Sequence, residues 1–253
     1  MKIAVVTGAS SGMGRDFVYA IDREFEPDEI WVVARRRERL EELAKNCTHR
    51  IRPVPLDLTD RASFATLSGL LESEKPDIRV LVNAAGYGLF GEFENMGTEE
   101  QLGIIELNDV AVTAVCHICL PYMKEGSDII NMGSNSSWQP VPYLNVYAAS
   151  KAYVLSFSRG LGRELKGRGI HVMCVCPGWI KTEFMDTAVR DDTIKYYDRW
   201  YESKQVIDRA MRDLKKKKKV SILGFPVRNQ VRLVKFLPVD FVMNTWCRQQ
   251  GKK

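Results

Sequence analysis

The chain has 253 residues, of which 45% are hydrophobic and 27% are charged. This composition is typical of a globular protein with one large domain or two small ones, and it excludes a disordered chain, a collagen and a coiled-coil rod. The longest apolar stretch that is nearly free of charge, 110–123, is shorter than the about 20 residues that cross a bilayer, so we expect no transmembrane helix. The apolar run after Met1 is too short for the core of a secretion signal, and we therefore expect a cytoplasmic protein.

Positive charge is concentrated in the C-terminal part of the chain. Residues 211–253 contain 12 basic and 2 acidic residues, a net charge of +10, whereas residues 1–210 contain 25 basic and 30 acidic residues, a net charge of −5. Such asymmetry can indicate binding to nucleic acid or to an anionic membrane. The lysine run 215–219 lies between a predicted helix and an apolar run, so we favour a solvated turn and expect no nucleic-acid partner.

The cysteines do not form a recognisable framework. In a reducing compartment we expect all six to be free thiols. Cys116 and Cys119 have the spacing of a zinc half-site but lack a second pair of ligands, so we expect no metal site.

Short apolar runs rich in β-branched residues alternate with stretches of helical period. We predict strands at 2–6, 30–34, 51–56, 79–83, 127–132, 170–175 and 220–223, and helices at 12–25, 37–46, 60–73, 98–124, 146–166 and 204–218. This alternation is typical of a parallel sheet with helices on both faces, which makes several strands apolar throughout. The sequence therefore predicts an α/β fold: a single doubly wound Rossmann-type domain over 1–253, with about seven parallel strands.

Three glycines lie between the first predicted strand and the helix that follows it. The loop reads Thr7, Gly8, Ala9, Ser10, Ser11, Gly12, Met13, Gly14. Glycine permits a sharp turn and a close approach of the backbone to a phosphate, and the helix N-terminus offers free N–H groups to that anion. The loop therefore predicts a dinucleotide site, although its spacing differs from the more familiar Gly-x-Gly-x-x-Gly. A glycine-rich turn without a ligand is the alternative.

The same loop also contains the Gly-x-Ser-x-Gly pattern of a hydrolase, with Ser10 as the nucleophile. Such an enzyme needs a histidine base late in the chain. His117 and His171 fall inside a predicted helix and a predicted strand, where a packed histidine is expected, so we rank a serine hydrolase last.

Three arginines follow the second predicted strand, where a carboxylate would bind the ribose hydroxyls of NAD. Guanidinium groups bind phosphate oxygens in a bidentate fork. Arg35 and Arg36 therefore favour the 2′-phosphate of NADP, and NAD is the less favoured cofactor. The alternative is a basic start to the next helix.

Tyr147 and Lys151 lie four residues apart near a predicted helix start, so their side chains share one helix face. A nearby cation lowers the pKa of a tyrosine, which makes Tyr147 a candidate acid and base. Ser134 follows the fifth predicted strand and can donate to a substrate oxygen. Asn108 is an amide inside a long predicted helix, which indicates a polar task. A surface Tyr/Lys pair and a satisfied buried asparagine are the alternatives.

In their order along the chain, these residues resemble the short-chain dehydrogenase/reductase family, in its compact branch of about 250 residues. The resemblance covers roughly 2–182. The glycine loop resembles the cofactor loop of the family, and Asp57 with Leu58 resembles its adenine-contacting pair. The turn at Asn83, Ala84, Ala85 and Gly86 resembles its Asn-Asn-Ala-Gly turn, with Ala84 in place of the second asparagine. Further matches are to the catalytic tetrad, at Asn108, Ser134, Tyr147 and Lys151, and to the nicotinamide segment, at Pro177, Gly178, Ile180 and Thr182.

The resemblance implies hydride transfer between a nicotinamide cofactor, NADP(H), and a carbonyl or secondary alcohol, usually as a reduction. It implies that Tyr147 transfers the proton, while Lys151 holds the ribose and lowers the tyrosine pKa. It also implies that Ser134 polarises the substrate oxygen and that Asn108 holds a water in a proton relay. A nucleotide-binding regulatory protein without turnover is the alternative.

Aromatic and apolar residues near the expected cleft favour a hydrophobic substrate of the steroid, acyl or aromatic ketone class: Trp138, Tyr143, Trp179, Phe184 and Met185. The irregular stretch 178–219 is predicted to be a substrate loop or lid. The glycine-rich C-terminus of the family is replaced by a basic, aromatic extension, 225–253, which leaves open a homodimer or a homotetramer. Its helical spacing is interrupted at Pro238, and we expect it first to cover the cleft, second to pair with another subunit, and last to touch a membrane.

Overall fold

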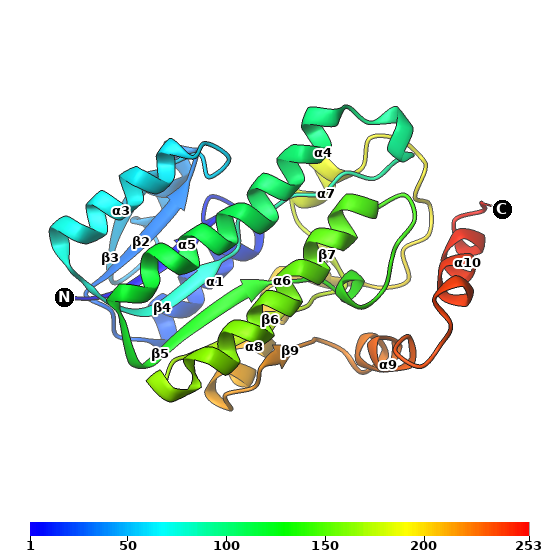
Figure 1. Ribbon diagram of the computed structural model, residues 1–253. Coiled ribbons are helices and arrows are strands. Elements are labelled where there is room, and N and C mark those ends of the chain that lie inside the picture. The colour runs from blue at the N-terminus through cyan, green and yellow to red at the C-terminus, as the bar shows by residue number, and fades with distance from the viewer. Residues whose placement is uncertain (253) are drawn as a thin grey trace.

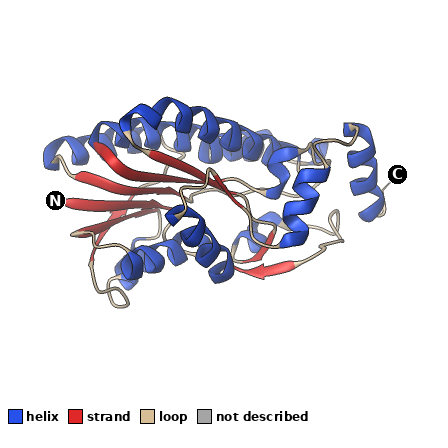
Figure 2. Cartoon of the chain, turned by 90° about the horizontal axis from the view of Figure 1, so that it is seen from below, coloured by secondary structure: helices blue, strands red, loops and turns tan. Residues whose placement is uncertain are grey.

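The computed structural model describes residues 1–252 and has a seven-stranded parallel sheet with helices on both faces (Figures 1 and 2). The strands are β1 (Lys2–Thr7), β2 (Glu29–Ala34), β3 (Arg50–Pro55), β4 (Asp77–Asn83), β5 (Met123–Met132), β6 (His171–Val175) and β9 (Val220–Ser221). Their order is β3-β2-β1-β4-β5-β6-β9, and every pair is parallel. The strand order reverses between β1 and β4, the place where ligands bind in such sheets. The predicted fold class is confirmed.

The helices cover the two faces in separate layers. One face is packed against α1 (Gly12–Glu24), α2 (Arg37–Leu43) and α8 (Ser203–Lys215). The other face is packed against α3 (Ala62–Glu74), α5 (Ala111–Cys119) and part of α6 (Asn145–Glu164). The remaining α-helices are α4 (Thr98–Ile105), α7 (Phe184–Ala188), α9 (Phe225–Leu233) and α10 (Val239–Gln249).

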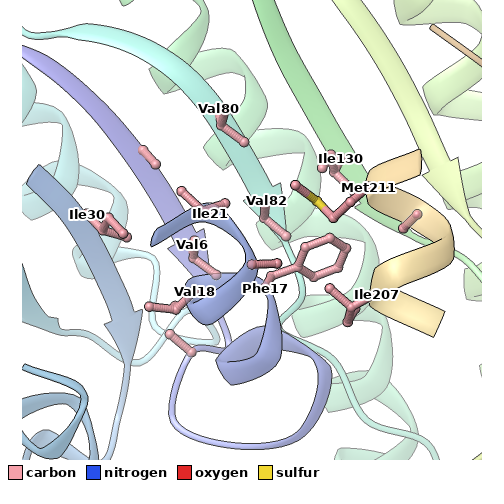
Figure 3. Close-up of a cluster of buried hydrophobic side chains, with 14 of the residues drawn as sticks. Val6, Phe17, Val18, Ile21, Ile30, Val80, Val82, Ile130, Ile207 and Met211 are labelled. Atoms are coloured by element: carbon pink, nitrogen blue, oxygen red, sulfur yellow. The ribbon is translucent and has the colours of Figure 1, made fainter. Parts of the chain in front are cut away.

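Neighbouring residues of each central strand point into different cores. Val6 of β1 joins Phe17 of α1 and Ile207 of α8 in one core (Figure 3), whereas Val5 joins Leu67 of α3 in the other. Both faces of the strand are therefore shielded from water, which explains why residues 3–6 of β1 are all apolar instead of alternating.

The predicted helix 98–124 contains a π-helical turn and ends earlier than expected. The turn, Glu106–Val110, joins α4 to α5 and contains Asn108. After Cys119 the chain passes through a 3-10 turn, and Met123 already pairs with Ile78 of β4. Strand pairing therefore overrides the helical pattern at the end of this segment.

The segment Thr98–Tyr122 is long and apolar enough to cross a membrane if only length and composition are considered. In the structure, however, it lies along the sheet (Figure 1), and Val112, Val115 and Cys119 are buried in the core. Packing against the sheet accounts for the apolar residues on this face of the helix.

The stretch 178–219 is more regular than predicted. It contains two short strands, β7 (Trp179–Lys181) and β8 (Trp200–Glu202), which pair in parallel as a separate small sheet, together with α7 and the whole of α8. Strands of three residues are too short for periodicity to reveal. The last strand of the main sheet, β9, is also shorter than predicted and has only two residues.

The lysine run is the turn between α8 and β9, and its cations are used within the fold. Lys215 pairs with Glu24 at 2.9 Å, Lys217 with Asp128 at 2.8 Å and Lys218 with Asp213 at 2.8 Å. These ion pairs support the turn interpretation over nucleic-acid binding. All six cysteines are free thiols.

Candidate active site

A cleft of about 1180 Å³, counted out to its open mouth, lies at the carboxyl ends of the central strands. It is where the strand order reverses, as expected for a doubly wound sheet. The cleft is lined by ten of the residues predicted to form the site: Met13, Ala84, Gly86, Ser134, Tyr147, Lys151, Pro177, Gly178, Ile180 and Thr182.

The glycine loop beside this cleft has a backbone that only glycine can form. Gly8 has a φ of +66°, and a Cβ atom there would lie 2.6 Å from the backbone nitrogen of Ala85. A Cβ atom at Gly14 would lie 2.2 Å from the carbonyl oxygen of Gly8. The loop is also tied to the turn after β4, because Thr7 Oγ1 accepts hydrogen bonds from the N–H groups of Ala84 and Ala85, at 3.1 and 3.2 Å.

The N-terminus of α1 is suited to hold an anion. Ser11 at the N-cap makes no capping hydrogen bond with its side chain. The first N–H groups of this 13-residue helix are therefore left without a side-chain acceptor at its positive end. Together with the glycine cradle, this arrangement fits the pyrophosphate of a dinucleotide.

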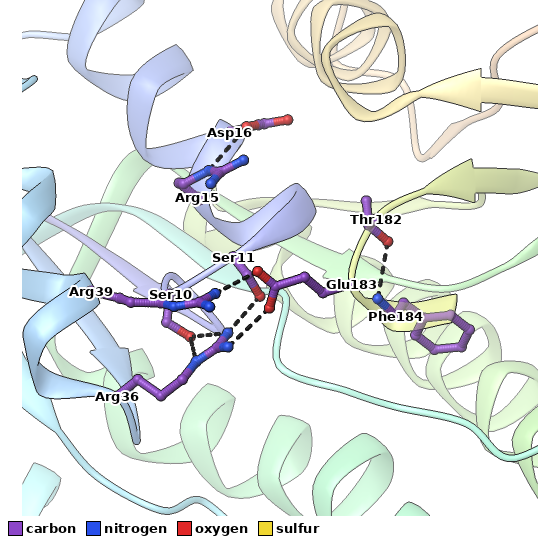
Figure 4. Close-up of polar contacts among 9 residues, drawn as sticks. All are labelled: Ser10, Ser11, Arg15, Asp16, Arg36, Arg39, Thr182, Glu183 and Phe184. Atoms are coloured by element: carbon purple, nitrogen blue, oxygen red, sulfur yellow. Dashed lines mark hydrogen bonds and ion pairs between the residues drawn. The ribbon is translucent and has the colours of Figure 1, made fainter. Parts of the chain in front are cut away.

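The two arginines predicted to recognise NADP lie in different surroundings. Arg36 reaches the glycine loop and donates hydrogen bonds to Ser10 Oγ at 3.0 Å and Ser11 Oγ at 2.9 Å (Figure 4). Arg35 instead lies 3.8 Å from Asp57 and is 73% exposed. Arg36 is thus the arginine that the structure brings to the loop.

Arg36 also forms an ion pair with a carboxylate, Glu183, that was not predicted from the sequence. Glu183, just after β7, pairs with Arg36 at 2.9 Å and with Arg39 at 2.5 Å (Figure 4). Hydrogen bonds from these two guanidinium groups hold the pKa of Glu183 below its ordinary value. Because Glu183 and Arg36 are 147 residues apart, no local pattern indicates the contact.

Three residues predicted to touch the cofactor have side chains committed to the protein itself. Asp57 Oδ1 accepts hydrogen bonds from the N–H of Thr59 at 3.0 Å and from its hydroxyl at 2.7 Å, and Leu58 is buried in the core. Asn83 Nδ2 donates to Asn131 Oδ1 at 2.9 Å, which ties β4 to β5.

Tyr147 and Lys151 lie on the first turns of α6, as the spacing predicted. Lys151 Nζ lies 5.7 Å from the centre of the Tyr147 ring and donates to the carbonyl of Met132 at 3.0 Å. Ser134 Oγ accepts from the N–H of Ser136 at 3.2 Å, which fixes the hydroxyl at the end of β5. Tyr147, Lys151 and Ser134 therefore face the same cleft.

Asn108 is completely buried behind this group, in the π-helical turn. Its Nδ2 donates to the carbonyl of Tyr87 at 3.0 Å and to Ser150 Oγ at 2.9 Å, and its Oδ1 accepts from the N–H of Tyr87 at 3.1 Å. A Cβ atom at Gly86 would lie 2.8 Å from Asn108 Oδ1 and 3.4 Å from Lys151 Nζ, so both atoms crowd this glycine. Sequence reasoning missed Ser150, although it lies within the Tyr-x-x-x-Lys segment.

Burial changes the pKa values of the site more than the Tyr147–Lys151 pair does. It raises the pKa of Tyr147 to about 12, against a hydrogen bond with Ser134 that lowers it. Lys151 does not lower the pKa of Tyr147 as the sequence predicted. Its ammonium group lies beside the ring, and burial disfavours the charged phenolate. Burial also lowers the pKa of Lys151 to about 8, although Asp109 opposes this effect.

Asp109 is a half-buried acid that no motif in the sequence indicated. Burial raises its pKa to about 7, and the charge of Lys151 opposes that rise. Asp109 directly follows Asn108 in the π-helical turn. Its pKa of about 7 and the Lys151 pKa of about 8 place the titrations of these two groups in neighbouring pH ranges.

Aromatic side chains form the outer wall of the cleft. Trp179 packs edge-on against Phe90, with ring centres 5.9 Å apart, and lies parallel to Trp246 of α10 at 6.5 Å. Trp246 is held there because its Nε1 donates to the carbonyl of Pro142 at 2.9 Å. The C-terminal segment thus covers the cleft, the first of its three expected roles.

Of the five apolar residues predicted near the cleft, Trp179, Phe184 and Met185 line it. Trp138 lies instead under the cations of Arg159 and Lys235, at 5.8 and 5.7 Å. Its place on a 3-10 turn directs it toward α9.

Among residues 1–252, no histidine is hydrogen-bonded to Ser10, the nucleophile of the hydrolase alternative. Ser10 Oγ accepts from Arg36, whereas His49 is bonded to Asp22 and His171 to Asp128, each at 2.9 Å. Neither of these histidines bonds to the serine that a hydrolase would use.

Two characterised proteins are similar to this chain over most of its length. The chain is 35% identical to sulfoacetaldehyde reductase 2 of Chromohalobacter salexigens over 197 residues, which cover 74% of this chain and 75% of that protein. It is 32% identical to the NADP-dependent 3-hydroxy acid dehydrogenase YdfG of Escherichia coli K12 over 196 residues, which cover 75% and 77%.

Solved structures share the fold. A short-chain dehydrogenase from Sphingobium yanoikuyae in complex with NADPH superposes with a TM-score of 0.79 at 26% identity, covering 94% of this chain and 97% of that one. A short-chain dehydrogenase/reductase from Burkholderia phymatum in complex with NAD has a TM-score of 0.80 at 19% identity, with 92% of both chains covered, and shows the fold alone. The sequence model described as short chain dehydrogenase matches residues 2–193. With this match, with relatives above 30% identity, and with the glycine loop and the Tyr147–Lys151 pair at one sheet edge, the chain belongs to the short-chain dehydrogenase/reductase family.

Proposed function

We propose that this oxidoreductase interconverts a hydrophobic carbonyl compound and its secondary alcohol with NADP(H) as the cofactor. The observation that carries the proposal is the position of the Tyr147 hydroxyl: it faces an aromatic-walled cleft beside Ser134 and Lys151, next to a loop built for a dinucleotide. When bound, the nicotinamide cofactor supplies the hydride.

The residues of the chain supply and position the proton. The raised pKa of Tyr147, about 12, keeps its hydroxyl protonated at neutral pH, which is the form that donates to a carbonyl oxygen during reduction. Ser134 Oγ donates a second hydrogen bond to that oxygen as negative charge develops. Lys151, with a pKa of about 8, stays largely cationic at neutral pH, and we infer that this cation holds the ribose of the bound cofactor.

Asn108 acts from behind the cleft as a positioning residue. Its hydrogen bonds to the Tyr87 backbone and to Ser150 fix the turn that contains Gly86. Since Asn108 Oδ1 and Lys151 Nζ approach the same glycine, we infer that a water near Gly86 passes protons between Lys151 and solvent.

The proposed preference for NADP rests on Arg36. This arginine already bonds to both serine hydroxyls of the glycine loop, and it binds an anion, the Glu183 carboxylate. Guanidinium suits a 2′-phosphate, whereas no carboxylate follows β2 directly to bind the ribose hydroxyls of NAD. The NADP-dependent dehydrogenase of E. coli supports this preference.

The wall of the cleft supports a bulky hydrophobic substrate. Besides Tyr147, five of its lining residues are aromatic, and each comes from a different segment of the chain: Phe90, Trp179, Phe184, Tyr196 and Trp246. The names of the two relatives refer to small anionic compounds, but among the described lining residues the charged ones are Lys151 and Asp198. Because no second cation lies in the cleft to bind a sulfonate or carboxylate, we favour an aromatic, steroid or acyl ketone.

The test is the reduction of an aromatic ketone, followed by loss of NADPH absorbance, in the wild type and in Tyr147→Phe. We expect the turnover number to fall about 100- to 10,000-fold in the variant, the range for loss of a general acid. NADPH binding, measured by fluorescence, should be unchanged. Tyr153→Phe, which alters an exposed tyrosine of the same helix, is the matched control. Equal turnover in wild type and Tyr147→Phe would contradict the mechanism, and NADPH binding without reduction of any carbonyl in a broad screen would favour a regulatory protein.

A further inference from the structure

The two C-terminal helices expose an unusual number of large apolar side chains. Thirteen large hydrophobic side chains are exposed among residues 1–252, and five of them lie between 225 and 241: Phe225, Leu233, Phe236, Val239 and Phe241. Phe236 is 85% exposed, and the other four are more than half exposed. Isolated exposed apolar residues are common, but a group of them on adjoining elements marks a surface that binds something.

Three of the exposed residues, Phe225, Leu233 and Phe241, lie on helix faces that point away from the packed sides of α9 and α10, and Phe236 lies in the connection between these helices. In α9, Val227 and Val231 are buried one turn apart. At 100° per residue, Phe225 and Leu233 fall on the opposite side of that helix. Because α9 already has a packed inner face, its outer phenylalanine is not part of the core.

The same division holds in α10, which Figure 1 shows at one end of the molecule, beyond α9. Val242 is buried, and Trp246, one turn later, lines the cleft. Phe241 points to the opposite side, which it shares with Arg248.

The charge around these residues is positive and unneutralised. Four cations lie on the two helices and their connection, and among the described residues none of them has an ion pair: Arg228, Arg232, Lys235 and Arg248. The lysine run before β9 differs, because three of its five lysines pair with carboxylates. Asp240 is the one acid on this pair of helices.

This combination favours an anionic partner over a second copy of the chain. In a symmetric dimer each surface meets itself, which would place the same arginines and lysine close to their equivalents and leave them uncompensated. Exposed phenylalanine and leucine flanked by lysine and arginine on amphipathic helices is the pattern of helices that lie in a membrane interface.

We propose that α9 and α10 dock this protein onto an anionic phospholipid surface, with Phe225, Leu233, Phe236 and Phe241 inserted among the lipids. The same helices line the substrate cleft through Gln230 of α9 and through Trp246 and Gln249 of α10. If the proposed function holds, this docking also means that the substrate is a lipophilic ketone that enters the cleft from the membrane.

The docking step is tested with the full-length protein by co-sedimentation with vesicles, without cofactor or substrate. We expect binding to vesicles of phosphatidylcholine and phosphatidylglycerol in equal parts, weak binding to pure phosphatidylcholine, and release at high salt. The double variant Phe236→Ser/Phe241→Ser should bind about 100-fold more weakly, about tenfold for each phenylalanine withdrawn from the lipid. Arg228→Gln/Arg232→Gln should lose about fivefold for each cation.

A matched control removes exposed apolar groups from another part of the molecule. Phe93→Ser/Leu102→Ser changes two similarly exposed side chains and should bind vesicles as the wild type does. The proposal is overturned if the wild type ignores anionic vesicles, or if the 236/241 variant binds them equally well. It is also overturned if the wild type is a dimer by sedimentation, the 236/241 variant is a monomer, and neither binds lipid. A second copy of the chain would then cover these helices.

A separate measurement keeps this inference distinct from the proposed function. The 236/241 variant should reduce a water-soluble aromatic ketone at the wild-type rate, and only its reduction of a ketone dissolved in anionic vesicles should slow. Vesicle binding without any ketone reduction would leave docking intact and refute the proposed function.

Discussion

Residues 2–193, which match the family, and residues 194–252, which lie outside that match, line the same cleft with different groups. The first region contributes backbone and polar groups at the sheet edge, including Gly86, Ser134 and Lys151. The second contributes Trp246 and the amides Gln230 and Gln249 from two helices. The difference teaches that every group proposed for proton transfer lies in the part this chain shares with its relatives, whereas the aromatic wall proposed to select the substrate is built from both parts.

A change in the shared region should affect every substrate, and the largest effect is expected in the glycine loop. Gly14→Ala places a Cβ atom 2.2 Å from the Gly8 carbonyl oxygen, so the loop must open, and NADPH affinity should fall by about 100-fold or more. The affinity is measured by fluorescence titration. Gly160→Ala, in a helix with open space around the new methyl group, is the control and should bind NADPH normally.

The pH dependence of ketone reduction tests whether the reaction needs the Lys151 cation, which lies in the region shared with the family. Burial lowers the pKa of Lys151 to about 8, so the cation is present below that pH and is lost above it. We expect kcat/KM for ketone reduction to fall about tenfold per pH unit above pH 8. The groups that influence Lys151 are Asp109, Cys174 and Cys176, and Asp109 is itself ionised above about pH 7.

Lys151→Arg distinguishes loss of this cation from other titrations. An arginine stays charged throughout the range, so the alkaline fall should move to higher pH even if the overall rate is lower. An unchanged profile in the arginine variant would assign the titration to another group.

A change in the C-terminal region should separate large substrates from small ones. Trp246→Ala removes the ring parallel to Trp179 and the hydrogen bond to Pro142, so we expect kcat/KM for a bulky aromatic ketone to fall about tenfold. A small aliphatic aldehyde should be reduced at the wild-type rate, and Trp246→Phe should retain part of the selectivity. Equal losses for both substrates would mean that α10 serves the shared chemistry instead.

The smallest expected effect concerns the carboxylate at the cofactor loop. Glu183→Gln frees Arg36 and Arg39 from an exposed ion pair, and NADPH affinity should rise, by up to about fivefold, while NADH affinity stays constant. Glu41→Gln, which alters the exposed pair with Arg37, is the control. An equal rise for NADH would show that Arg36 does not distinguish the two cofactors.

Features that depend on local spacing were predictable from the sequence. The strands, the glycine loop and the Tyr147–Lys151 pair each follow from a short pattern, and their order along the chain indicated the family. The pairing of Glu183 with Arg36 and the reach of Trp246 to Pro142 join residues more than 100 positions apart, so only the folded chain shows them. The spacing of Tyr147 and Lys151 predicted a lowered tyrosine pKa, but burial of the phenol raises it instead.

The π-helical turn at Glu106–Val110 carries one residue more than an ordinary helical turn would, which offsets the two halves of this long segment by one position. Removing a single residue there would restore a regular helix, at the cost of rotating everything on one side of the deletion by about 100°. If the N-terminal side rotated, Asn108 would no longer lie beside Gly86. If α5 rotated instead, Val115 would leave the core under the sheet. A regular helix and the present position of the Asn108 amide are therefore incompatible in this segment.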